Sequence, residues 1–399
     1  MKKTISAVLA LIMIMSVTVF AGAAEKKNLK FSEDGTFRIL QLSDTQDDQY
    51  PADDMLNLVR LSIEESDPDL IVFTGDLVED SRIGDIGIDG ESLREGVVVK
   101  KNGEIDHDAT LENLTAAADA VLKIFQESGV PFVIAQGNND HKCGISNEEW
   151  LEIYGKYSNC LLEDMSSDEG GALDCNLEIK DSTGKTAFNI WIMDTMRGGA
   201  AQDQIEWYKS ASAELKEKNG GEPVPSILFQ HIQVKDIGNL FVECSPFDNG
   251  AKGTTSGFYR LNDEIAHGYN FFTYYPCEPS EQFKAWKEQG DVIGAFFGHQ
   301  HVEGFSGIVD GIELGFTYGS EMAKTGPYGY RLITLHEDDA KNYDNELYTY
   351  EGSVKFNNAH FEKQIDSVSD EPSNPVLKAF NVIKNFVVSI VFFIINLFA

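Results

Sequence analysis

The fold is decided by a stretch that reads Phe37-Arg38-Ile39-Leu40-Gln41-Leu42-Ser43-Asp44-Thr45-Gln46. Its first part is a short, mainly apolar run, which is typical of a strand buried on both faces of a sheet. Its last part places two metal-capable side chains, Asp44 and Gln46, directly after that strand. Four further apolar runs end in the same way: 70–75 before Asp76, 132–137 before Asn138, 226–230 before His231, and 292–298 before His299 and His301.

These five runs predict a two-metal site. Ligands in α/β sheets bind beyond the carboxyl ends of strands, so the polar side chains should meet at one rim. Two divalent ions about 3.5–4 Å apart can hold both the attacking and the leaving oxygen of a phosphoryl transfer. Asp76 is the candidate bridge, because one carboxylate has an oxygen for each ion. Imidazoles and a side-chain amide as the other ligands suit Mn, Fe or Zn better than Ca.

The segments between the runs predict an α/β fold. Residues 53–65, 111–128 and 202–218 have compositions and spacings typical of helices. Alternation of strands and helices implies a parallel or mixed sheet. Two late segments, 311–318 and 330–335, are predicted to be strands without a helix between them.

The motifs as a set resemble those of one enzyme family. The calcineurin-like metallophosphoesterases have the pattern D-x-H, G-D, G-N-H-[DE], H and G-H-x-H. The chain presents in the same order Asp44-Thr45-Gln46, Gly75-Asp76, Gly137-Asn138-Asn139-Asp140, His231 and Gly298-His299-Gln300-His301. Segments 204–231 and 296–331 look like the branch related to purple acid phosphatases. The resemblance implies a four-layer α/β/β/α sandwich, in which helices flank two mixed sheets.

The resemblance also implies a role for each ligand. The first metal would be bound by Asp44, Asp76, His301 and the residue at Gln46. The second would be bound by Asp76, Asn138, His231 and His299. A hydroxide bridging both ions would attack phosphorus in line with the ester oxygen.

The chain departs from the family pattern at two positions. Gln46 stands where the family usually has His, and an amide oxygen is a weaker ligand for a transition metal, so the first site should bind loosely or select a harder ion. Asn139 stands where the family has a His that faces the phosphate and assists the leaving group. Asn139 can donate a hydrogen bond but cannot act as an acid. His141 is a candidate replacement, and an ordinary loop histidine is the other interpretation.

Single motifs have simpler interpretations. His231 alone could be a structural histidine, and Asp76 alone could begin a turn. Asp194, at the end of the run 188–193, fits the same rim but is interpreted as a helix or turn cap. The polar residues 84–108 are predicted to form a loop over the site, with His107 as a candidate substrate contact, and residues 238–275 are predicted to form a second wall.

Composition agrees with an enzyme that acts on small molecules. The 399 residues include 42% hydrophobic residues, enough for a large core. The chain has 32 basic and 65 acidic residues, a net charge of -33. This balance argues against a nucleic acid as partner, because phosphate backbones are bound by clustered Lys and Arg. The five cysteines are too few and too scattered for a disulfide framework, although Cys143 could pair with Cys160 or Cys175.

Both ends of the chain predict a location outside the cytoplasm. Residues 1–24 have the basic start, apolar stretch and small residues of a secretory signal peptide. Residues 25–363 would form the metallophosphoesterase domain and residues 364–375 a polar linker. The apolar tail 376–399 could span a membrane, lie along its surface as a helix, or dock on the core. An anchor on the outer face of the cell membrane is the preferred interpretation.

The predicted function is an exported, metal-dependent phosphoesterase. A phosphomonoesterase acting on small phosphorylated substrates is the first choice, and a phosphodiesterase or nucleotidase is the second. The alternative from another class is a surface binding module that kept the fold and lost turnover, which Gln46 and Asn139 motivate.

Overall fold

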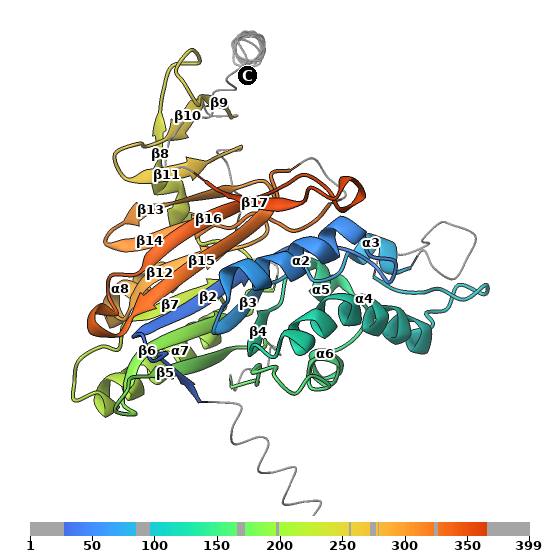
Figure 1. Ribbon diagram of the computed structural model, residues 1–399, viewed down its shortest axis with the longest axis horizontal. Helices are drawn as coiled ribbons and strands as arrows, with labels where there is room; N and C mark the ends of the chain where they lie inside the picture. The colour runs from blue at the N-terminus through green and yellow to red at the C-terminus, as the bar shows by residue number, and fades with distance from the viewer. Residues whose placement is uncertain are drawn as a thin grey trace, which may run out of the picture.

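The structure is a computed structural model that describes residues 28–84, 96–165, 172–196, 199–254, 257–271, 277, 279–322 and 326–364. Two mixed sheets lie face to face, and helices cover the outer face of each sheet (Figure 1). The predicted four-layer α/β/β/α sandwich is therefore confirmed. The predicted signal peptide 1–24, the tail 376–399 and all but the first residue of the linker 364–375 lie outside the described residues.

The first sheet carries the amino-terminal half of the site. Within the described residues it has six strands, in the order β17 (His360–Lys363), β16 (Asp344–Glu351), β15 (Gly329–His336), β2 (Thr36–Leu42), β3 (Leu70–Thr74) and β4 (Phe132–Ala135). Strands β2, β3 and β4 are parallel, and the other three pair antiparallel. The carboxyl ends of β2, β3 and β4 therefore meet at one edge.

The second sheet carries the other half of the site. Its eight described strands follow the order β1 (Leu29–Lys30), β5 (Cys175–Lys180), β6 (Thr186–Met193), β7 (Ser226–Gln230), β12 (Val292–Phe297), β14 (Ile312–Phe316), β13 (Gly304–Val309) and β11 (Ala266–Tyr269). The central strands β6, β7, β12 and β14 are parallel. The predicted strands at 311–318 and 330–335 thus correspond to β14 and β15, which belong to different sheets.

Helices connect the parallel strands. The described α-helices are α2 (Asp53–Ser66), α3 (Asp80–Ile83), α4 (His107–Ser128), α5 (Asn138–Lys142), α6 (Asn147–Tyr154), α7 (Gln202–Lys218) and α8 (Gln282–Gln289). Short 3-10 turns lie at η1 (Lys235–Leu240), η2 (Glu337–Asp339) and η3 (Val354–Phe356). Helices α2 and α4 cover the first sheet, and α7 and α8 cover the second (Figure 1). Among the described residues, no helix has the length and apolar character that crossing a membrane requires.

Helix α4 begins four residues before the predicted start at 111. Asp106 caps it by accepting a hydrogen bond from the Ala109 backbone N–H, a favoured way to begin a helix. The prediction that residues up to 108 form a loop is therefore wrong at its end. His107 is the first helical residue, and its Nε2 lies 2.6 Å from Glu149 Oε1 in α6.

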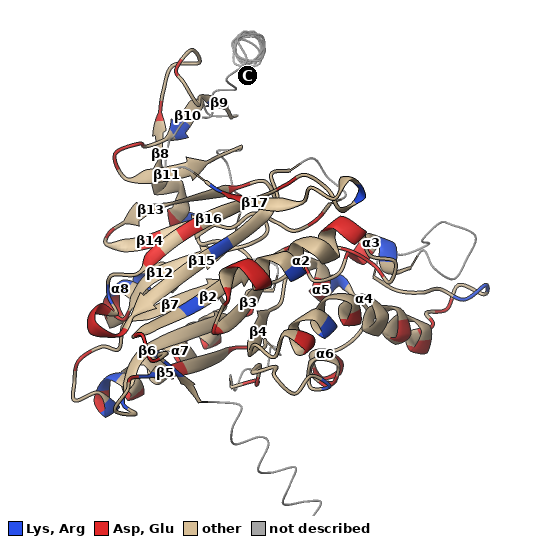
Figure 2. Ribbon diagram, viewed as in Figure 1, with Lys and Arg blue, Asp and Glu red and all other residues tan. Residues whose placement is uncertain are grey.

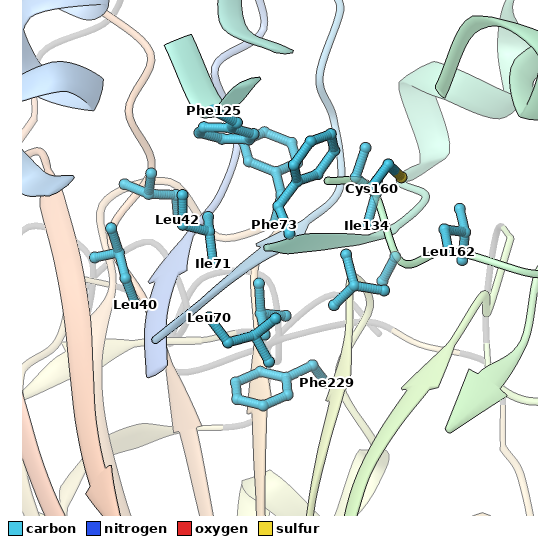
Figure 3. Close-up of a cluster of buried hydrophobic side chains, with 14 of the residues drawn as sticks. Leu40, Leu42, Leu70, Ile71, Phe73, Phe125, Ile134, Cys160, Leu162 and Phe229 are labelled. Carbon is cyan, nitrogen blue, oxygen red and sulfur yellow. The ribbon is translucent and has the colours of Figure 1, made fainter. Parts of the chain in front are cut away.

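The main core lies between the two sheets and beneath α2 and α4. Along β3, Ile71 and Phe73 face the helices while Leu70 faces the opposite sheet, where Phe229 of β7 lies below it (Figure 3). The Phe73 and Phe125 rings lie 6.3 Å apart, which packs α4 onto β3. A second buried cluster joins α7 and α8 to the outer face of the second sheet. Burial of apolar surface on both faces of these strands explains why their sequences are continuous apolar runs.

The segment predicted as a second wall contains a small separate sheet. Its strands follow the order β8 (Phe241–Glu243), β10 (Phe258–Leu261) and β9 (Lys252–Gly253), and it extends beyond the edge of the two large sheets (Figure 1). The sequence left open whether Cys143 pairs with Cys160 or Cys175. All three are buried, and none forms a disulfide within the described residues.

Candidate metal centre

The strand ends bring the predicted ligands to one rim. Asp44, Asp76 and Asn138 follow β2, β3 and β4 of the first sheet, and His231 and His299 follow β7 and β12 of the second. A hydrogen bond joins the two halves, because the His299 backbone N–H donates to the Asp44 side-chain Oδ2 at 3.0 Å. The predicted ligands therefore lie together at one rim, and the structure shows that both sheets contribute to it.

Within the described residues, two groups of side chains are close enough to bind a metal. Asp76, His231 and His299 form one group, and Asp44, Asp76 and His301 form the other, with the ligand atoms of each group within 4.8 Å of one another. Asp76 belongs to both, which is the position a bridging carboxylate must have. The roles of these residues as metal ligands stay a prediction. The closeness of their ligand atoms, which this prediction requires, is present.

Four of the predicted ligands have unusual backbone conformations. Asp44, Gln46, Asp76 and His299 have φ angles of 52°, 37°, 55° and 69°. Left-handed backbone is uncommon outside glycine and concentrates at functional sites, where the surrounding structure holds it. The turns after three separate strands are thus shaped to aim side chains inward.

Two glycines permit the close approach of these turns. Gly75 has a φ angle of 85°, and a Cβ there would lie 2.7 Å from His231 Nδ1. A Cβ at Gly298 would lie 2.0 Å from Ser43 Oγ. Any larger residue would push the two sheets apart at the rim, so the glycines beside the predicted ligands are required by space.

The His231 imidazole is oriented for a metal. Its Nδ1 lies 2.7 Å from the Thr74 carbonyl oxygen, so Nδ1–H donates there and Nε2 is the nitrogen that can bind a metal once it loses its proton. Nε2 lies 3.2 Å from Asn138 Oδ1 and 3.3 Å from Asp76 Oδ2. Three potential ligand atoms therefore converge, and the far ring nitrogen is fixed by a carbonyl, as is usual for metal-binding histidines.

His301 has the same arrangement in the first group. Its Nδ1 lies 2.6 Å from Glu321 Oε2, and its Nε2 lies 3.3 Å from Asp44 Oδ1. Asp44 Oδ1 is buried and has no well-aligned hydrogen-bond donor among the described residues. A buried carboxylate oxygen without a donor is costly unless a cation faces it. The residues present therefore fit a metal ion.

Gln46 is the weak point of the first group. Its Nε2 donates to Asp76 Oδ2 at 2.6 Å, so the amide N–H faces the carboxylate that an ion would share. An ion bound there needs an oxygen from Gln46, which requires the amide to turn over. In this orientation Gln46 presents an N–H rather than an oxygen to the first group.

His141 is placed at the rim but already has a partner. Its Nε2 lies 2.5 Å from Asp194 Oδ1, and its side chain is only 6% exposed. Burial opposes its protonation, but Asp194 outweighs burial and raises the pKa of His141. Asp194 also accepts the backbone N–H of Met196, as the predicted turn cap would. Asp194 therefore holds His141 as well as capping a turn.

Two residues of the site carry little or no sequence signal. Asp140 is fully buried and accepts hydrogen bonds from the backbone N–H groups of Asp76 and Gly137. In the sequence, only its position in the third motif distinguishes it. Glu321, which holds His301, lies in a segment with no recognisable pattern. Both act through folded contacts with distant residues.

Carboxylates at the site favour the protonated form of two of the candidate ligand histidines. Burial disfavours a charged His231, but the Asp76 carboxylate outweighs burial and raises the pKa of His231 to about 9. Burial also opposes protonation of His301, yet Asp44 and Glu321 raise the pKa of His301 to about 10. An ion must therefore displace protons from both imidazoles.

His299 behaves differently. Burial and the neighbouring His231, whose ring lies 5.0 Å away, lower the pKa of His299 to about 4. This imidazole is neutral at pH 7 and can bind a metal without losing a proton.

We expect the affinity for Mn²⁺ to rise as the pH increases from 6 to 9, because His231 and His301, with pKa values of about 9 and about 10, must release protons. Each proton displaced changes the affinity roughly tenfold per pH unit. Calorimetric titration in two buffers of different ionisation enthalpy measures the protons released. An affinity that is independent of pH would contradict this assignment.

The metal-free chain should show the opposite trend in stability. The raised His pKa values add stability that is fully present below pH 6.5 and is lost as the pH rises through about 9 and about 10. The melting temperature without metal should therefore fall over this window, while the gain from added Mn²⁺ grows.

The chain is similar to several known proteins. A protein named probable inactive purple acid phosphatase 14, from Arabidopsis thaliana, is 25% identical over 345 residues, which cover 76% of this chain and 75% of that protein. Probable inactive purple acid phosphatase 28 of the same plant is 23% identical over 346 residues, 76% of this chain and 72% of that protein. The crystal structure of a dimetal phosphatase from Danio rerio covers 83% of this chain and 99% of its own, with 11% identity and a TM-score of 0.46.

The family model described as calcineurin-like phosphoesterase matches residues 37–303. This span begins in β2, ends just after His301, and includes all the predicted metal ligands. The chain belongs to the calcineurin-like phosphoesterase family, and the two plant relatives are named as probable inactive purple acid phosphatases.

Proposed function

We propose that the protein hydrolyses phosphoesters of small molecules, phosphomonoesters first, with two bound metal ions such as Mn, Fe or Zn. The observation that carries this proposal is the pair of ligand groups that share Asp76. When bound, the ions would supply Lewis-acid charge and a nucleophile at neutral pH.

The candidate ligands would be divided between the two ions. Asp44 and His301 would bind one ion, His231 and His299 the other, and Asp76 both. The Asn139 backbone N–H donates to Asp76 Oδ1 at 2.8 Å, which holds the bridging carboxylate in place. Placing all these groups before substrate arrives avoids reorganisation during the reaction.

The surface charge supports a small substrate. Asp and Glu are spread over most helices and loops, with Lys and Arg scattered among them (Figure 2). A net charge of -33 repels an extended polyanion, while a local cationic centre can still bind one phosphoryl group. We also propose that the protein is exported and anchored at the outer face of the membrane, on the basis of the two apolar ends of its sequence. Fractionation of cells that express the tagged full chain tests this location.

The test of the enzyme is hydrolysis of an aryl phosphate, as monoester and as diester, by the full chain. The protein is stripped of metal, and Mn, Fe, Zn and Mg are then added back singly. Turnover that returns with metal supports the proposal, and the ratio of monoester to diester rates separates phosphatase from phosphodiesterase. A folded, metal-loaded protein that cleaves neither ester would overturn it.

A second candidate function is a binding module with weakened or lost turnover. It is favoured by the Gln46 amide, which donates to Asp76 at the place where an ion needs an oxygen. The curated relatives are themselves named as probable inactive. Full metal occupancy without hydrolysis of any phosphoester would support this candidate over the enzyme.

Replacing Gln46 with histidine should tighten the weaker of the two metal sites by roughly tenfold to a hundredfold. Imidazole is a better ligand than an amide for Mn, Fe or Zn and would end the competition for Asp76 Oδ2. Titration with Mn²⁺, with metal content measured after dialysis, gives both affinities. The exposed Gln202→His variant is the control, and equal affinities in wild type and Gln46→His would show that Gln46 already serves as a good ligand.

A further inference from the structure

A lysine that the motifs do not include lies beside the metal centre. Lys142 is the last residue of α5, four positions after Asn138, so the two lie on the same side of this short helix. Its Nζ donates to Asn139 Oδ1 at 3.0 Å and lies 3.6 Å from Asp80 Oδ2. The ammonium is thus held by two partners from different elements.

Asn139 connects this ammonium to the candidate ligands. Its Oδ1 also accepts a hydrogen bond from Asn138 Nδ2 at 3.0 Å. Its backbone N–H donates to Asp76 Oδ1 at 2.8 Å. A change in the place of Asn139 would move the Lys142 ammonium, the Asn138 amide and the shared carboxylate together. Asn139 therefore contacts all three groups.

The ammonium keeps capacity for a further partner. An ammonium has three N–H donors, of which one donates to Asn139, while Asp80 at 3.6 Å is an ion-pair partner beyond hydrogen-bond distance. The Lys142 side chain is 39% exposed, whereas that of Asp80 is 5% exposed, so the cation is the reachable member of this pair. The nearby Arg82 differs, because its guanidinium is bound to both Asp47 and Asp48.

We propose that Lys142 donates a hydrogen bond to a phosphoryl oxygen of the substrate, with Asn139 holding the ammonium in place. During transfer, negative charge is spread over the three peripheral oxygens of the phosphoryl group, so an ammonium near the metal centre would stabilise charge that develops on one of them. This role rests on the proposed function, because it needs a phosphoryl group bound at the metal centre.

The test compares Lys142→Met and Lys142→Arg with wild type in the Mn-loaded full chain. Two quantities are measured: the affinity for inorganic phosphate by calorimetry, and kcat and KM for aryl phosphates. Lys142→Met should weaken phosphate binding and lower kcat/KM by about tenfold to a hundredfold, and Lys142→Arg, which keeps a cation, should lose less. The control is Lys209→Met, whose side chain is also 39% exposed and ion-paired, with Glu288 on the outer layer.

Manganese content separates substrate binding from a structural role. It should be the same in all four proteins, and a Lys142→Met protein that loses Mn would overturn the proposal in favour of a supporting role for Asn138. Unchanged phosphate affinity and kcat/KM in Lys142→Met would also overturn it. If wild type binds phosphate without turnover, the proposed hydrolysis fails, yet the phosphate affinities still decide the role of Lys142. If wild type does neither, both proposals fail.

Discussion

Replacing Asp76 with asparagine is expected to reduce phosphoester hydrolysis about a thousandfold or more. Asp76 is the one side chain that belongs to both ligand groups, and an amide has a single oxygen to offer. The content of bound Mn should fall from two ions to one or none. Turnover of an aryl phosphate and metal analysis after dialysis check both results.

The substitution should leave the fold intact, which makes the result interpretable. Asp76 has a φ angle of 55°, and asparagine tolerates this left-handed conformation. Its Oδ1 can still accept the Asn139 backbone N–H. Asp338→Asn, an exposed change in η2, is the control. If Asp76→Asn kept the turnover and metal content of the wild type, the assignment of Asp76 as the carboxylate shared by two ions would be wrong.

Replacing Asp140 with alanine is expected to destabilise the chain by about 3–5 kcal/mol, because several buried donors lose their acceptor together. Asp140 Oδ2 accepts the N–H groups of Asp76 and Gly137 at 3.0 and 2.8 Å, and Oδ1 accepts those of Leu77 and Val78 at 3.0 and 3.3 Å. Urea unfolding of the metal-free protein measures the free energy of unfolding.

The same substitution should also loosen metal binding, because the carboxylate fixes the turn that carries Asp76. Asp140→Asn keeps one acceptor oxygen and should lose less stability than alanine does. Asp338→Ala serves as the control for removal of a surface carboxylate. A loss below about 1 kcal/mol in Asp140→Ala would indicate that water reaches the N–H groups and replaces the carboxylate.

The predicted strand ends and helices were close to those of the structure because the signals are local. Helix α7 has the predicted bounds of Gln202 and Lys218, and α2 extends one residue past the predicted end at 65. The start of α4 was misplaced because the residues around Asp106 have a polar composition typical of a loop. That composition hides the cap that Asp106 forms at the helix start. Apolar periodicity reports burial along a segment, but not the contact that ends it.

The candidate ligands could also be named from the sequence, because each directly follows an apolar run or lies two residues beyond that position. Parallel strands that share a sheet bring their carboxyl ends together, which groups the ligands after β2, β3 and β4 and, separately, those after β7 and β12. The meeting of these two groups depends on how the two sheets pack. The orientation of the Gln46 amide toward Asp76 was not predictable, since it depends on a contact between residues 30 positions apart. The pairing of His141 with Asp194, 53 positions away, has the same cause.

By itself, the sequence determined the fold class, the rim on which the site lies and the residue types that can bind metal there. These follow from burial and from local turn geometry, which act over a few residues. Only the tertiary structure decided that the Gln46 amide faces Asp76, that Glu321 holds His301, and that Lys142 reaches Asn139 and Asp80. Such hydrogen bonds and ion pairs depend on how the two sheets and α5 pack in three dimensions, and no spacing along the chain encodes those distances.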